Sequence, residues 1–117
     1  MKIIYSILLI VSSSHLYGQI FQEHIVSLFA LDAFYIDAAD IDGDGDMDIL
    51  SASYSDNTIA WYENDGAENP SWSATDIVTN AIGARCVFAS DIDGDGDIDI
   101  ISASRNDDTI AWYENKM

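Results

Sequence analysis

The chain of 117 residues contains an internal repeat, and this repeat limits the possible folds more than any other feature. Residues 39–64 align with residues 90–115 at an offset of 51 positions, and 20 of the 26 paired positions are identical. A period near 50 residues is typical of propeller blades and related β arrays rather than of helical repeats. We therefore expect two copies of one small unit within a single domain.

Each repeat consists of short apolar or β-branched runs separated by polar, glycine-rich turns, which is the pattern of β-strands. Consecutive apolar positions, as in Ile59–Tyr62, predict strands that are covered on both faces. No window keeps the 3.6-residue period of an amphipathic helix. The predicted fold class is all-β, with two four-stranded antiparallel propeller-type blades; the expected strands lie at 34–38, 47–53, 58–63, 72–78 and 86–89.

The two ends of the repeat region suggest an exchanged strand. Residues 21–33 resemble residues 72–84, where the fourth strand of the first repeat is expected. The strands would then follow the order 4-123-4-123, a partial β-propeller. Closed propellers have about four to eight blades. Self-association or additional repeats would therefore be needed to complete a ring.

Residues 1–18 have the layout of a secretory signal peptide. Lys2 supplies a positive charge, residues 3–11 are almost uniformly apolar, and three serines at 12–14 and a small residue at Gly18 follow. The apolar run is shorter than the roughly 20 residues that span a bilayer. We expect a signal peptide at 1–18, β repeats at 19–117, no transmembrane segment, and a product that is secreted or at the cell surface.

The charge and the cysteine content exclude several classes of protein. The chain has 21 acidic and 4 basic side chains, a formal net charge of −17. Such a charge repels phosphate, so nucleic acid is excluded as a partner. The single cysteine, Cys86, excludes an internal disulfide framework, and we expect it to be a buried free thiol.

Each repeat carries an alternating aspartate loop, at 40–48 and at 91–99. Calcium prefers six to eight oxygen ligands at about 2.3–2.6 Å, and short carboxylates in a tight turn can supply them. Two carboxylates about 4 Å apart repel by roughly 4 kcal/mol at an effective dielectric near 20, so a cluster of four favours a bound cation. The predicted side-chain ligands are Asp40, Asp42, Asp44 and Asp48, and Asp91, Asp93, Asp95 and Asp99.

Position 7 of such a loop usually contributes its backbone carbonyl, which adds Asp46 and Asp97 to the two predicted calcium sites. Magnesium suits the loop less well, because it demands octahedral geometry and retains its waters. The loops do not match a helical EF-hand, because its twelfth position needs a bidentate glutamate, where the chain has Ser51 and Ser102, and because the flanking segments read as strands.

The DxDxDGxxD loop between two strands, in a repeat of about 50 residues, resembles the FG-GAP/VCBS repeats. These repeats build the calcium-bearing β-propellers of integrin α subunits and of many secreted bacterial proteins. The resemblance implies that each of the two loops binds one calcium ion. The Phe-Gly and Gly-Ala-Pro signatures of the family are missing, and Ser51–Ser53 and Ser102–Ser104 occupy the latter place.

These features favour an exported calcium-binding β-propeller-type module that binds or adheres to a protein or glycan, with calcium in a structural role. The alternative is a non-catalytic fragment or accessory propeller domain of a larger secreted polysaccharide-active enzyme. We expect no catalytic activity, because cation binding accounts for every acidic cluster. The recurring Trp61-Tyr62 and Trp112-Tyr113 pairs are interpreted as packing residues rather than as a sugar-stacking platform.

Overall fold

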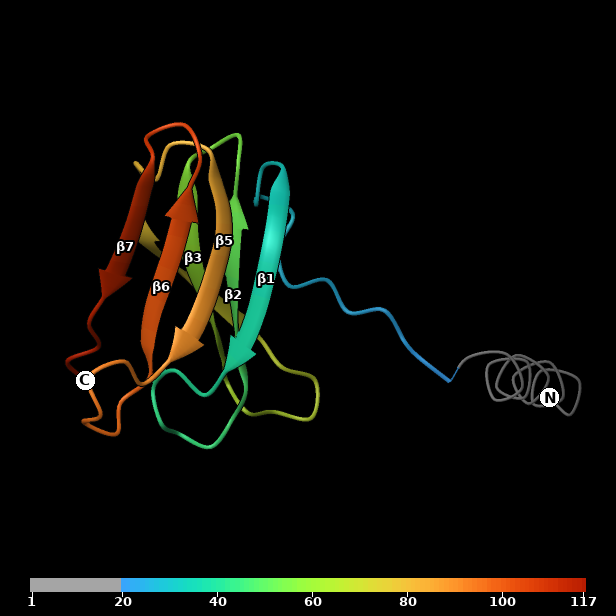
Figure 1. Cartoon of the computed structure of the whole chain (residues 1–117). Coiled ribbons are helices and arrows are strands. Elements are labelled where there is room, and N and C mark those ends of the chain that lie inside the picture. Colours follow the sequence, from blue (N-terminus) through green and yellow to red (C-terminus); the bar gives the residue numbers. More distant parts are fainter. Residues whose placement is uncertain (1–19) are drawn as a thin grey trace, which may run out of the picture.

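A computed structural model describes residues 20–117, and the predicted signal peptide at 1–18 lies outside this range. The described part of the chain forms seven strands in two antiparallel sheets, without a helix (Figure 1). It therefore includes no helix long and apolar enough to cross a membrane. The first sheet has the order β1-β2-β3-β4, with β1 at Ala33–Ala39, β2 at Asp48–Ser53, β3 at Thr58–Asn64 and β4 at Trp72–Val78.

The second sheet repeats the first three strands. Its order is β5-β6-β7, with β5 at Ala84–Ser90, β6 at Asp99–Ser104 and β7 at Thr109–Tyr113. Each sheet is a meander of neighbouring antiparallel strands, and the irregularity between Ala33 and Tyr35 recurs between Ala84 and Cys86. All-β architecture is thus confirmed, and the predicted strand positions agree with the structure to within a few residues.

The alternation of side chains along β2 and β6 defines the two faces of each sheet. Leu50 and Ala52 lie on one face of β2, while Ser51 and Ser53 lie on the other, and all four are buried. The Ser51 hydroxyl lies 3.4 Å from the Tyr62 hydroxyl, so the polar group has a partner. β2 is therefore covered on both sides, as the consecutive apolar positions of the repeat predict, whereas β7 exposes Ile110 and Trp112.

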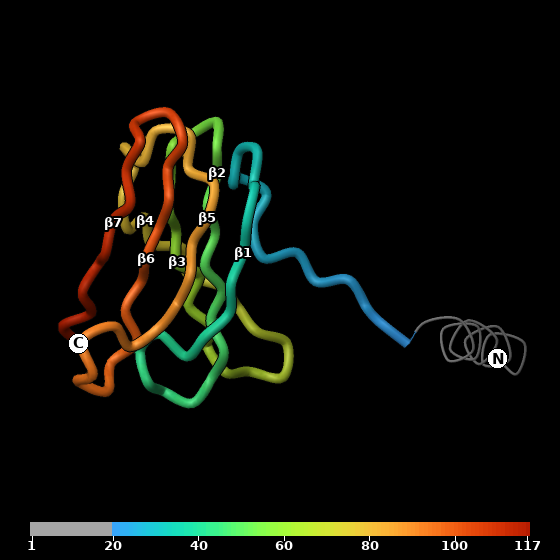
Figure 2. The backbone as a smooth tube through the Cα atoms, in the orientation of Figure 1, coloured from blue at the N-terminus to red at the C-terminus, as the bar shows by residue number. Residues whose placement is uncertain are grey.

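The two sheets lie face to face, with β5 packed against β1 and β2 (Figure 2). Leu50 and Ile59 of the first sheet meet Val87 and Ile100 of the second in one apolar core. The interface also contains polar contacts: the Ala89 N–H donates to the Asp37 carboxylate at 2.9 Å. The Arg85 guanidinium lies 4.3 Å from the centre of the Phe34 ring. Such contacts fix how one sheet sits on the other.

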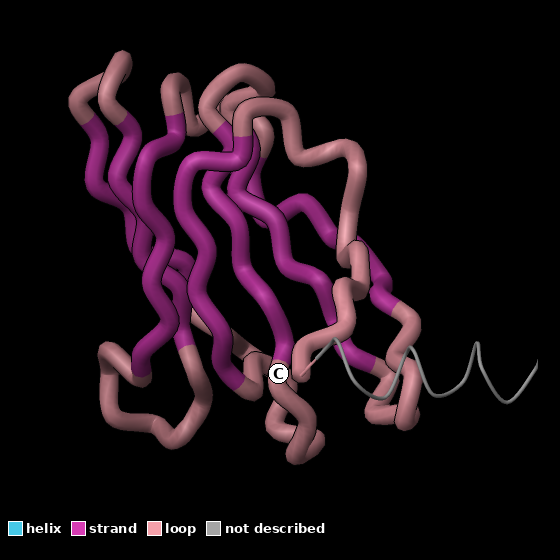
Figure 3. Tube along the Cα trace, turned by 90° about the vertical axis from the view of Figure 1, so that its right-hand side faces the viewer, coloured by secondary structure: helices cyan, strands magenta, loops and turns pink. Residues whose placement is uncertain are grey.

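The short turns and the long loops occupy opposite ends of the strands (Figures 1 and 3). The turns that join β2 to β3 and β6 to β7 contain Asn57 and Asp108 in the left-handed region, with φ of 59° and 53°. Asparagine and aspartate tolerate this conformation better than other non-glycine residues. Both aspartate loops lie at the other end, so the fold places the two candidate cation sites on one side of the molecule.

The structure corrects the expectation of two four-stranded blades. Residues 20–32 form bends and turns, and the second sheet has three strands, so the fourth strand predicted within 21–33 is absent from the described chain. A strand needs an edge to pair with. Within the described residues β7 lacks the neighbour that its counterpart β3 has in β4, and β7 lies on the far side of the molecule from β1 (Figure 1). Cys86 is a free cysteine, but it is half-buried rather than buried.

Candidate metal centre

Each aspartate loop is stabilised by hydrogen bonds between its own carboxylates and its own backbone. In the first loop the Asp40 carboxylate accepts the N–H groups of Asp44 and Gly45, at 3.1 and 2.9 Å. In the second loop the Asp91 carboxylate accepts those of Gly94 and Gly96, at 2.8 and 2.9 Å. These bonds curl the chain around the first carboxylate of each loop, so that the following aspartates face the same centre.

Glycine is required in these loops by their backbone conformation. Gly43 and Gly45 have φ of 74° and 96°, and Gly94 and Gly96 have φ of 76° and 96°. A side chain at such positive φ angles costs free energy, whereas glycine adopts them readily. The near-identical angles show that the two loops share one conformation, as the sequence repeat predicts.

The last aspartate of each loop is the most rigidly held. Asp48 is fully buried, and its carboxylate accepts the N–H of Ile41 at 3.0 Å and that of Asn64 at 2.9 Å. Asp99 is equally buried and accepts the N–H of Ile92 at 3.0 Å and that of Asn115 at 2.8 Å. Each carboxylate therefore ties its loop to the end of the third strand of its sheet.

Three carboxylates of each loop converge on one point. Ligand oxygens of Asp40, Asp42 and Asp48 all lie within 4.8 Å of one another, and so do those of Asp91, Asp93 and Asp99. Three hard oxygen donors at this separation can contact a common cation, and calcium completes its shell with carbonyls or water. The donor set thus fits a hard divalent ion.

The remaining predicted ligands are placed differently. Asp44 clusters with Asp42 and with Glu63, a residue that the sequence pattern did not single out. Asp95 bonds the backbone N–H of Asp97 at 2.9 Å and does not join the triad of its loop. Glu63 lies near the end of β3 in the identical Trp-Tyr-Glu-Asn segment, and that recurrence was the available signal for its position beside the loop.

The electrostatics of the loops reflect crowded negative charge. Loss of hydration raises the pKa of Asp42 to about 6, and the neighbouring charges of Asp44 and Asp48 act in the same direction. Loss of hydration likewise raises the pKa of Asp93. The backbone N–H of Asn115, by contrast, lowers the pKa of Asp99. One member of each triad thus resists ionisation when no cation is bound, whereas Asp99 is held as the anion.

An aspartate loop between two strands, repeated in two stacked antiparallel sheets, defines a class of β repeat that presents acidic clusters at one end. Comparison with protein families identifies the class more closely: residues 40–102 match the FG-GAP-like repeat. This match covers more than half of the chain, which therefore belongs to the FG-GAP-like repeat family. Neither the search of curated proteins nor the search of solved structures returned a match.

Proposed function

We propose that the chain is an exported, calcium-stabilised module of propeller-type β repeats that presents a surface for a protein or glycan. The observation that carries the proposal is the duplicated carboxylate triad, Asp40, Asp42 and Asp48 in one loop and Asp91, Asp93 and Asp99 in the other. The two proposed sites are completed by the side chains of Asp44 and Asp95 and by the backbone carbonyls of Asp46 and Asp97.

Calcium has a structural role in this proposal. The triads bring like charges together at the end of the sheets, and their mutual repulsion opposes folding until a cation neutralises it. At a calcium concentration ten times Kd, each site would add about 1.4 kcal/mol to the free energy of unfolding. Extracellular calcium modules work at Kd of about 10⁻⁴–10⁻³ M, which matches the proposed secretion or display at the cell surface.

The acidic end of the molecule is the surface proposed for a protein or glycan partner. Both loops lie there, and calcium would hold them in the shape in which they meet a partner (Figure 1). The proposal gives the chain no catalytic role, because its clustered carboxylates serve as ligands. A glycan array probed with the calcium-loaded chain tests the partner class, and signals that persist unchanged in chelator would contradict a calcium-shaped surface.

Isothermal titration of the purified chain with calcium tests the cation sites directly. We expect two calcium ions per chain and weaker binding of magnesium. The variant Asp42→Asn should remove one site, and Asp93→Asn should remove the other. Asp76→Asn is the matched control, because Asp76 is an exposed acid on β4, outside the loops. Binding of less than one ion per chain, or equal losses for all three variants, would overturn the assignment.

A further inference from the structure

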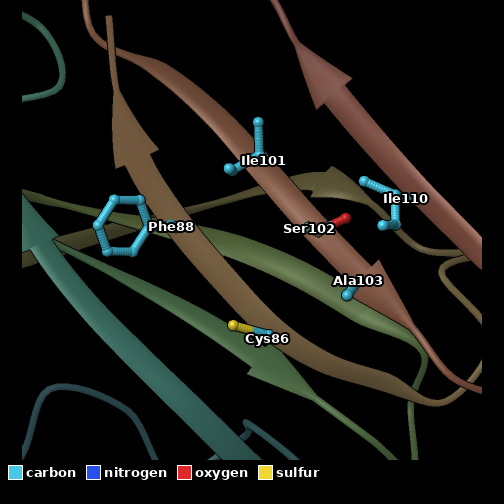
Figure 4. A pocket seen from close by; sticks show the side chains of 6 residues that line it. All are labelled: Cys86, Phe88, Ile101, Ser102, Ala103 and Ile110. Atoms are coloured by element: carbon cyan, nitrogen blue, oxygen red, sulfur yellow. The ribbon is translucent and has the colours of Figure 1, made fainter. Parts of the chain in front are cut away.

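The outer face of the second sheet is exposed although its counterpart in the first sheet is buried. We call this the open face, and a shallow apolar pocket lies on it (Figure 4), lined by Cys86, Phe88, Ile101, Ser102, Ala103 and Ile110. At the offset of 51 residues, Ile110 corresponds to Ile59 of the first sheet. Ile59 is 0% exposed under β5, whereas Ile110 is 85% exposed. The open face thus has the composition of a covered face.

The outer face of the first sheet corresponds to the face of the second sheet that packs inside the molecule. Val87, which packs against the first sheet, is fully buried, while its counterpart Ile36 is 65% exposed. Ile49 and Tyr62 lie beside Ile36 around a second pocket, and residues 23–30 form its other wall. Each molecule therefore carries both halves of its own internal sheet-to-sheet interface, one bare and the other covered in part by residues 23–30.

Residues 21–32 resemble the fourth strand of the first sheet and the link that follows it, but they pair with no strand in the described part of the chain. They resemble 72–83 with a shift of one residue, which aligns Ile25-Val26 with Ile77-Val78. Asp32 and Gly83, at the offset of 51, both adopt the left-handed conformation, with φ of 56° and 70°. The carbonyl of Asp32 accepts the N–H of Tyr54 at 3.0 Å, as the carbonyl of Gly83 accepts that of Arg105 at 3.0 Å. The end of this segment is therefore already shaped as the link that follows a fourth strand.

The residues before that link expose apolar side chains and pair with no strand of the described chain. Ile25 is 60% exposed and Leu28 is 76% exposed. In the described residues the outer edge of β7 is also unpaired, whereas β3, its counterpart, pairs with β4. An unpaired strand edge is a template for another chain. The described part of the molecule thus contains both a strand-like segment without a pairing partner, residues 21–29, and an unpaired strand edge, that of β7.

The contacts that join the two sheets are chemically suited to repetition between copies. Arg85 lies over Phe34, at 4.3 Å, and 5.5 Å from the ring of Tyr54. By the offset, the position of Arg85 corresponds to Phe34, and the position of Tyr54 corresponds to Arg105. Repeating the interface between two molecules would set Phe34 of one beside the exposed Arg105 of the other, which restores a cation–π pair with the roles exchanged.

We propose that copies of this chain assemble head to tail. The first sheet of one copy covers the open face of the next, and residues 21–29 of the first copy add as a fourth strand to β7 of the next. The interface is heterologous, and rotation from copy to copy closes it into a ring. Propellers of about four to eight blades would correspond to about two to four copies of two blades each. This assembly goes beyond the proposed cation binding and uses other residues.

Sedimentation velocity of the purified chain in calcium tests the assembly, together with two variants that each damage one half of the interface. Ile110→Lys places a charge on the open face, and Ile36→Lys places one on the complementary face. We expect a closed oligomer for the unaltered chain and a monomer for each variant alone. Ile82→Lys is the matched control, because Ile82 is 47% exposed in the link before β5, and it should assemble normally.

Mixing the two monomeric variants gives the decisive result. Each retains one intact half of a head-to-tail interface, so the mixture should form a 1:1 dimer that neither variant forms alone. A third variant, I25P/V26P, should also be monomeric but melt like the monomeric Ile110→Lys, because these prolines break no strand of the isolated chain.

Three outcomes would overturn the proposal: an unaltered chain that stays monomeric in calcium, a mixture that does not pair, or an Ile36→Lys variant that assembles normally. The last would indicate face-to-face pairing of two open faces. Calcium titration of the monomeric Ile110→Lys variant separates this result from the cation sites. Two ions bound by that monomer would leave the metal assignment intact even if the assembly fails.

Discussion

The substitution Asp42→Asn should change protein stability in opposite directions with and without calcium. A carboxylate oxygen of Asp42 lies within 4.8 Å of carboxylate oxygens of Asp40 and Asp48. Two charges at that distance repel by about 3.5 kcal/mol at an effective dielectric of 20, and by about 0.9 kcal/mol in bulk water. Because Asp42 is half-exposed, solvent screening reduces the relief from removing its charge to about 1–2 kcal/mol. In chelator at pH 7, the variant should therefore be more stable than the unaltered chain.

Saturating calcium should reverse the order, because the variant loses a ligand of the first site. At ten times Kd the lost linkage is about 1.4 kcal/mol, in addition to the weakened contact with the ion. The amide oxygen of asparagine can keep the hydrogen bond from the Asp44 N–H, which is 3.2 Å in the unaltered protein, so the loop need not rearrange.

Urea unfolding in chelator and in calcium measures both effects, with Asp76→Asn as the control for the general change in net charge. We expect the control to shift stability in the same direction under both conditions and by less than about 0.5 kcal/mol, as surface changes usually do. An Asp42→Asn variant that is less stable than the unaltered chain in chelator would refute the reasoning. It would show that the aspartate triad is not electrostatically strained.

Three further outcomes are expected. Replacing the buried Asp48 by asparagine removes one of the two acceptors for its backbone N–H donors, and in calcium it should cost about 1.5–3 kcal/mol by urea unfolding, more than Asp42→Asn does. The raised pKa of Asp42, about 6, predicts that calcium affinity falls below that pH, because protons compete with the ion for the carboxylate. Without calcium, protonated Asp42 stabilises the fold fully below about pH 4, and this stabilisation is lost as the pH rises through 6. Calcium titrations and urea unfolding at a series of pH values measure the two effects. Gly66→Ala should destabilise the chain by about 1–2 kcal/mol, because Gly66 has a φ of 72°. The loss should exceed that of Gly43→Ala, because a Cβ at Gly66 would meet the Asp46 carboxylate, whereas a Cβ at Gly43 meets no atom within 4 Å. Equal shifts in melting temperature for the two variants would contradict this.

Much of the fold could be predicted because the same pattern of apolar runs, glycines and aspartates occurs twice in the sequence. The strand positions followed from runs such as Ile59–Tyr62, and the loop conformation followed from glycines such as Gly43 that alone adopt positive φ at low cost. The triads followed from the alternation of aspartates, since the chain around them is short and tightly turned.

The details that sequence reasoning missed depend on contacts between distant segments. The place of Glu63 beside the first loop comes from β3 ending at that loop, which no local spacing reports. Residues 21–33 carry the pattern of a strand, but the strand edge that corresponds to the one β4 pairs with is that of β7, in the other sheet. Cys86 lies in an apolar run, yet its face of the second sheet has nothing packed on it within the described residues. In each case the local pattern did not say which segment, if any, would lie beside the residue.

The side chain of Asn115 gives the two acidic loops a mechanical connection. Its amide nitrogen donates to the carbonyl of Ile98 in its own loop, at 3.0 Å, and to that of Ile41 in the other loop, at 2.9 Å. The corresponding amide of Asn64 donates to Met47 of its own loop, at 3.0 Å. Because one amide donates to both loops, displacement of either carbonyl would disturb the hydrogen bond to the other loop. If both loops bind calcium as proposed, this shared amide would couple the two sites, and the stacking of the sheets would then set their cooperativity.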